Sequence, residues 1–141
     1  MSFSFKYKPA KLKSGKAIYR PMLPLTIFGE ETIDIFAMLD SGSDISVLPK
    51  EIAETLEIKY FEEDELYGIT GNKVKSKIGR VNISFGKGRE NYRFQIPVVV
   101  PEKGDTPIIL GRTGFFNKFK ITFFEKEKRI IFKKVPDKQL F

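Results

Sequence analysis

Apolar and polar residues alternate with a period of two along much of the chain, which predicts a protein built mainly from β-strands. The clearest run is TIDIFAML at 32–39, which begins as an alternation and ends as a continuous apolar stretch. We therefore expect a strand that enters the core. Other strands are predicted at 17–28, 81–85, 92–100, 107–111, 120–124 and 129–133. Turn-forming residues at 29–31, 86–89 and 125–128 would join three pairs of these strands as hairpins.

Two prolines interrupt the first of these strands. Pro21 and Pro24 lie within the otherwise β-rich segment AIYRPMLPLTIF at 17–28. Proline has no backbone N–H to donate to a neighbouring strand, so it is found at sheet edges and in irregular strands. We expect this segment to lie at an edge or to be irregular.

Helical patterns are few and short. The segment PKEIAETL at 49–56 has a proline in the first turn, early acidic residues, and three apolar residues on one face, Ile52, Ala53 and Leu56. Thr113 is expected to cap a second short helix that runs to Phe119. Many short strands with one or two short helices predict a mainly β fold, a closed or nearly closed β-barrel.

The composition limits the chemistry that the chain can perform. With 141 residues it suits one core, which we place at 17–134, between a basic arm at 1–16 that could join the sheet and a tail at 135–141. The chain has no cysteine and no histidine, so thiolate catalysis, a Ser-His-Asp triad and His- or Cys-ligated metal are excluded. We expect neither a metal nor another cofactor.

No apolar run approaches the roughly 20 residues that span a bilayer, and the charged N-terminus is not followed by an apolar stretch. We expect no membrane association and a cytoplasmic location.

The net charge of +7 is unevenly distributed along the sequence. Six basic residues precede the first acidic one, Glu30, whereas residues 51–65 are mainly acidic. A basic arm could bind nucleic acid by neutralising phosphates. Scattered lysines on a small domain more often form a solvated surface, which is the interpretation we favour.

The segment FAMLDSGSDISVLP at 36–49 is the main candidate for chemistry. An apolar strand delivers Asp40, small residues follow, and Ile45, Val47 and Leu48 return to the core. Taken alone, Asp-Ser-Gly is also a common turn sequence. A second apolar run that ends in glycine, PIILGR at 107–112, lies far downstream, and a glycine-bearing segment, YGITGN at 67–72, lies between the two.

These three segments, in this order, resemble the retroviral-type aspartic proteases, the retropepsins. The resemblance runs from about Ala17 to Phe132. It implies a homodimeric β-barrel that hydrolyses peptide bonds in extended or unfolded polypeptide, with one catalytic Asp40 from each subunit. Two carboxylates that share a proton can activate a water and polarise the scissile carbonyl, and a C2 dimer would bring the two together.

The resemblance also assigns the other candidate residues. Ser41, Gly42 and Ser43 would support the catalytic loop, since Gly42 has no Cβ and its N–H can hold a carboxylate oxygen. Asp44 would pair with Arg112 near the substrate groove. The second signature strand would be formed by Ile109, Leu110 and Gly111. A flap that contacts substrate would contain Tyr67, Gly68, Ile69, Thr70 and Gly71.

Two other functions fit parts of the sequence. The chain could be a dimeric interaction module that keeps this fold with little activity, or a basic β-barrel that binds nucleic acid. The GXXG at 68–71 also occurs in KH domains, but there it joins helices, whereas the residues that follow here are β-like. Five phenylalanines are expected in the core and not as a base-stacking platform: Phe115, Phe116, Phe119, Phe123 and Phe124.

Overall fold

Six strands close into a β-barrel in the computed structural model, which describes residues 1–67 and 73–137. Around the barrel the order is β4 (Met22–Phe28), β5 (Thr32–Leu39), β10 (Ile109–Leu110), β6 (Ser46–Val47), β9 (Glu90–Pro101) and β8 (Lys73–Lys87). The barrel closes because β8 also pairs with β4, through Thr26–Phe28. β7 (Tyr60–Tyr67) pairs with the edge of β8 opposite to β9, and β7 is itself an edge strand of the sheet.

The barrel interior is filled by the apolar residues of the alternating pattern. On β4 the odd-numbered residues from Leu23 to Ile27 are buried, and the even-numbered ones are half-buried. The neighbouring strands contribute Ala37, Leu39, Val81, Ile83, Phe85, Ile96, Val98 and Val100. The helix α1 (Lys50–Leu56) follows an extended Pro49 and adds Ala53 and Leu56 to the core.

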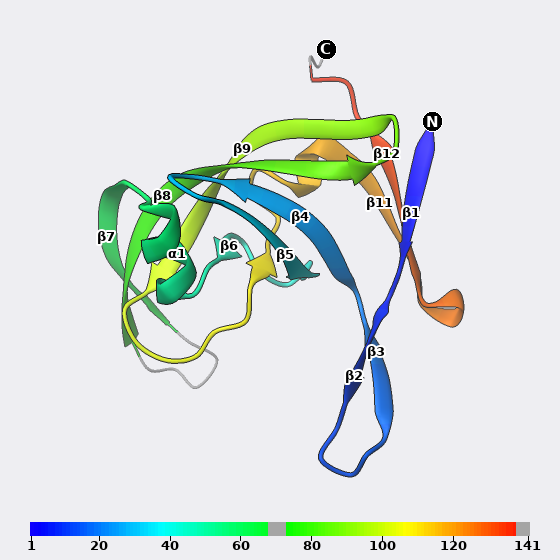
Figure 1. The fold of residues 1–141 in the computed structure, drawn as a ribbon, viewed down its shortest axis with the longest axis horizontal. Coiled ribbons are helices and arrows are strands. Elements are labelled where there is room, and N and C mark those ends of the chain that lie inside the picture. The colour runs from blue at the N-terminus through cyan, green and yellow to red at the C-terminus, as the bar shows by residue number, and fades with distance from the viewer. Residues whose placement is uncertain (68–72, 138–141) are drawn as a thin grey trace.

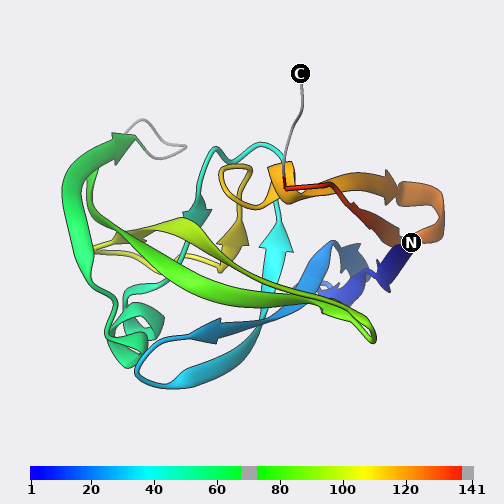
Figure 2. The same ribbon diagram turned by 90° about the horizontal axis from the view of Figure 1, so that it is seen from above.

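A second, three-stranded sheet packs its aromatic residues against the barrel. It consists of β1 (Ser2–Lys6), β12 (Arg129–Lys134) and β11 (Phe119–Phe124). Phe132 lies 4.9 Å from Phe85 of the barrel between ring centroids, and Phe3 lies 5.5 Å from Phe132. This sheet, coloured blue and orange to red in Figure 2, lies at the opposite end of the molecule from α1 and β7.

The remaining strands form a projecting hairpin. β2 (Lys8–Lys11) and β3 (Ala17–Arg20) make a separate two-stranded sheet. Figure 1 shows it extending away from the barrel. We call residues Lys8–Arg20 the β2–β3 arm. β1, which precedes the arm, pairs with β12 throughout its length, so the N-terminal segment contributes to the sheets.

Most of the predicted elements are confirmed. The hairpins at 29–31, 86–89 and 125–128 form, and 125–127 is a short 3-10 helix, η2 (Glu125–Glu127). The irregularity expected from the prolines is also present. Pro21 separates β3 from β4, and Pro24 lies where β4 pairs with β5 alone, before its pairing with β8 begins at Thr26.

Two predictions need correction, and one strand was not predicted. Thr113 caps no helix: the next helical residues form a 3-10 turn, η1 (Phe116–Lys118), which is preceded by Phe115 and has no side-chain cap. Phe123 and Phe124 are 40% and 41% exposed because β11 is an edge strand that ends beyond the core, whereas Phe115 and Phe119 are buried. The strand β7 was not predicted, because half of the residues in its sequence YFEEDELY are charged.

Candidate active site

Asp40 follows the last residue of β5, where that strand is held from both sides. Its backbone N–H donates to the carbonyl oxygen of Leu110 at 3.0 Å, and the N–H of Leu39 donates to that of Pro21 at 2.9 Å. These bonds join three segments far apart in the sequence. The backbone that carries the Asp40 carboxylate is therefore fixed by the barrel and not by the loop alone.

The loop after Asp40 turns back onto the carboxylate. The N–H of Gly42 donates to Asp40 Oδ1 at 2.9 Å, and the N–H of Ser43 donates to the Asp40 carbonyl at 3.2 Å. A Cβ at Gly42 would lie 3.2 Å from the same carboxylate oxygen, closer than most real contacts. A hydrogen bond to an ionised carboxylate is stronger than a neutral one and sets its orientation. Asp40 itself is half-buried, so it can meet a ligand.

The segment after β10 packs directly on the other side of this loop. A Cβ at Gly111 would lie 2.4 Å from the carbonyl oxygen of Ile45, so only glycine permits this approach. Two further backbone bonds fasten the segments together: Arg112 N–H to the Ser43 carbonyl and Thr113 N–H to the Asp44 carbonyl, both 2.9 Å. Leu110, the second residue of β10, is buried. The two predicted signature segments thus lie side by side.

Ser46 is a positioning residue that the sequence interpretation missed. Its side chain is 1% exposed, and its hydroxyl accepts a hydrogen bond from the N–H of Gly111 at 3.0 Å. The signal in the sequence was a single serine between Ile45 and Val47, in a run otherwise bound for the core. A buried hydroxyl in such a place needs a partner. Here the partner belongs to the second signature segment.

Asp44 and Arg112 form an ion pair, with Arg112 Nη2 donating to Asp44 Oδ1. Their side chains are 86% and 53% exposed, so water screens the attraction and the pair contributes little to stability. Beside it is an open hollow of about 340 Å³, which Thr113, Gly114 and Asn117 also line. The pair therefore lies at the protein surface, on the loop that follows Asp40, and does not support the core.

The other predicted site residues are only partly placed. Ser41 is exposed next to Asp40, and the Ser43 hydroxyl donates to the carbonyl of Ile45 at 2.8 Å. Tyr67 ends β7 opposite Lys73 of β8, so these two strands form the sides of a hairpin. The proposed flap residues Gly68, Ile69, Thr70 and Gly71 lie outside the described residues.

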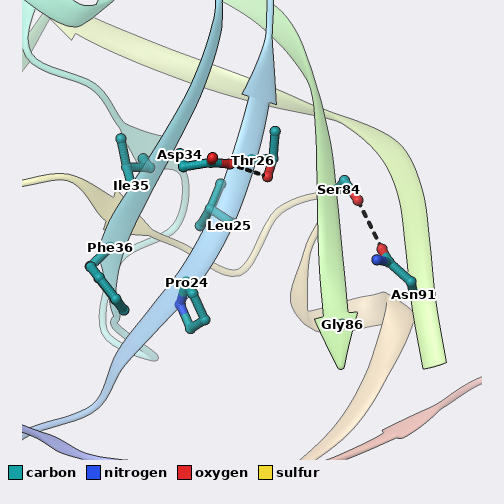
Figure 3. A pocket seen from close by; sticks show the side chains of 9 residues that line it. All are labelled: Pro24, Leu25, Thr26, Asp34, Ile35, Phe36, Ser84, Gly86 and Asn91. Carbon is teal, nitrogen blue, oxygen red and sulfur yellow. Dashed lines mark hydrogen bonds between the residues drawn. The ribbon is translucent and has the colours of Figure 1, made fainter. Parts of the chain in front are cut away.

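A separate cavity of about 270 Å³ lies on the outer face of β4 and β5, and Figure 3 shows its lining. Its polar groups already bond to one another: Thr26 donates to Asp34 at 2.6 Å, and Ser84 donates to Asn91 at 2.8 Å. Asp34 precedes Asp40 by six residues of extended strand, a separation of roughly 20 Å. This cavity is therefore not part of the Asp40 site.

Residues 1–67 and 73–137 contain neither a metal-binding cluster of acidic residues nor a membrane-spanning helix. No three Asp or Glu side chains gather there in a way that could hold a metal ion. Over the same ranges, no helix has the length and apolar character needed to cross a membrane.

Comparison with known proteins places this geometry in context. A family model described as aspartyl protease matches residues 23–113, which include both signature segments. The structure of the EIAV protease in complex with the inhibitor HBY-793 superposes with a TM-score of 0.50 at 24% sequence identity, covering 73% of this chain and 88% of that protease. This likeness shows a retropepsin fold. No curated protein matches the sequence.

Proposed function

This chain belongs to the aspartyl protease family, specifically its retropepsin-like members, and on that premise we propose that it is an endopeptidase whose active site forms between two copies. Each copy would contribute one Asp40. The substrate would be an extended or unfolded polypeptide, because hydrolysis by a pair of carboxylates needs access to both sides of a peptide bond.

The observation that carries this proposal is the held carboxylate at the end of β5. Asp40 accepts from the Gly42 N–H at 2.9 Å and lies against the β10 segment, yet it remains half-buried and open to a ligand. Within the described residues, no second carboxylate is bonded to it. A dyad therefore requires another chain. A two-fold axis beside Asp40 would place the Asp40 carboxylate of a second copy next to the first.

In the proposed reaction one Asp40 is ionised and its counterpart is protonated. The ionised carboxylate takes a proton from water, and the resulting hydroxide bonds to the scissile carbon while the protonated carboxyl gives its proton to the carbonyl oxygen. The tetrahedral species then collapses: the C–N bond breaks, the leaving nitrogen receives a proton from the carboxyl that took one from water, and one of the two hydroxyls returns its proton to the other carboxylate as the C=O bond re-forms. The Gly42 N–H would hold each carboxylate in place throughout, and Ser41 could bond across to the opposite loop.

Cleavage of an unfolded protein by wild type and Asp40→Asn tests the proposal. We expect fragments from wild type, none from Asp40→Asn, and wild-type activity from the control Asp34→Asn, which changes an exposed aspartate of β5, the strand that leads to Asp40. A dimer with no cleavage at any pH would instead indicate an interaction module with this fold.

A further inference from the structure

The net charge of this protein is concentrated in its first twenty residues. They contain six basic residues and no acidic one: Lys6, Lys8, Lys11, Lys13, Lys16 and Arg20. The rest of the chain holds 19 basic and 18 acidic residues, so it is nearly neutral. The +7 charge is thus a property of the N-terminal segment, and most of it lies on the β2–β3 arm.

The charges of the arm are not neutralised by the barrel. Lys8 lies opposite Arg20 across the two strands, an arrangement of like charges that destabilises a hairpin. Among the described residues, Lys11, Lys13 and Lys16 make no ion pair. By contrast, Glu63 on the acidic strand β7 lies opposite Lys77 of β8. The electrostatic attraction of an anionic partner would therefore be strongest at the arm.

The C-terminal end of the arm lies beside the candidate active site. Pro21 immediately follows β3, and its carbonyl accepts the N–H of Leu39, the residue before Asp40. From Pro21 to Lys16 is five residues of extended chain, or roughly 17 Å. A peptide bound by Lys11, Lys13 and Lys16 would therefore need only a few further residues to extend to the Asp40 carboxylate.

The backbone of the arm favours a polypeptide ligand. β2 and β3 pair only with each other, so each has one edge of N–H and C=O groups without a neighbouring strand in the described structure. An extended peptide can add to such an edge, and side-chain charge then sets the preference. Nucleic acid would use the lysines but not the strand edges.

We propose that the β2–β3 arm is an exosite that recruits polypeptide substrates through an acidic extended segment located about five to ten residues from the cleaved bond. This inference rests on the proposed protease function. The arm would act on substrate capture and not on the chemical step, so it should lower KM without changing kcat.

Two peptide substrates with the same cleavage sequence test the exosite, one with a flanking Glu/Asp tract at this spacing and one with Gln/Asn in its place. We expect the acidic peptide to have a KM roughly tenfold lower at low salt, with the advantage shrinking as salt screens the charges. The variant Lys11→Gln/Lys13→Gln/Lys16→Gln should remove most of the difference. The matched control Lys120→Gln/Lys126→Gln/Lys133→Gln, which removes three exposed charges elsewhere, should keep it.

Binding of a labelled acidic peptide to Asp40→Asn, followed by fluorescence anisotropy, separates the two proposals. Arm-dependent peptide binding without cleavage by wild type would overturn the protease function and leave the arm as a docking surface for acidic peptides. Equal KM values for the two peptides, or equal effects of the two triple variants, would overturn the exosite alone. Arm-dependent binding of a single- or double-stranded oligonucleotide, with no preference for the acidic peptide, would also overturn it and identify a nucleic-acid surface.

Discussion

Replacing Ser46 by alanine tests whether the two signature segments are held together as the structure indicates. The change removes one hydroxyl from a side chain that is 1% exposed, and it leaves the N–H of Gly111 without its acceptor at 3.0 Å. A buried N–H that loses its partner costs about 1–3 kcal/mol. For a domain of this size, that loss lowers Tm by roughly 3–12 °C.

The matched control is Ser84→Ala, because Ser84 is a half-buried serine of β8 whose hydroxyl makes a solvent-exposed hydrogen bond to Asn91 at 2.8 Å. Water can replace that bond, so we expect a change within about 0.5 kcal/mol. Both variants are measured by urea unfolding, with the slope of free energy against denaturant checked for constancy. If Ser46→Ala unfolds at the same midpoint as Ser84→Ala, the hydroxyl does not fasten these segments.

Three other changes have expected outcomes. Gly111→Ala places a Cβ 2.4 Å from the Ile45 carbonyl oxygen and should destabilise the fold by about 1–3 kcal/mol, measured by urea unfolding; unchanged stability would contradict the close approach. Arg112→Ala removes an exposed ion pair and should lower the free energy of unfolding by at most about 1 kcal/mol in the same assay. A decrease of several kcal/mol would mean that the pair is buried in solution. A hydrogen bond from Lys128 lowers the pKa of Glu125 below its ordinary value of 4.5, so this pair stabilises the fold at neutral pH and is lost as pH falls through the lowered pKa. The Tm difference between wild type and Glu125→Gln should therefore be largest near pH 7 and vanish in strong acid; a difference independent of pH would refute the pair.

The sequence was sufficient to predict the barrel because its core strands carry a regular pattern. The run 32–39 and the hairpin around 86–89 form as expected, since one face of each strand must be apolar to reach the interior. The strand β7 was missed for the same physical reason. An edge strand needs no apolar alternation where its side chains face solvent, as those of residues 60–64 do, and YFEEDELY shows none.

The residues of the site and two of its contacts, Gly42 with Asp40 and Asp44 with Arg112, could be predicted, but not the contacts that join the two signature segments. Asp40 and Gly111 were found through their motifs, but the bond from Gly111 to Ser46 joins positions 65 residues apart. Such a contact depends on how the barrel closes, which local pattern does not encode. For Asp44 and Arg112 the pairing was expected, but its exposure to solvent was not, because exposure follows from the path of the loop in the folded protein.

The central claim, that catalysis requires an Asp40 from each of two chains, is tested most directly by mixing wild-type and Asp40→Asn protein. The two are allowed to exchange subunits at constant total concentration, and cleavage of an unfolded protein is measured against the mole fraction of wild type. If both carboxylates are needed, the rate follows the square of that fraction, and an equal mixture retains about one quarter of the wild-type rate. A rate proportional to the fraction, with about one half retained, would show that a single chain is catalytic and contradict the account.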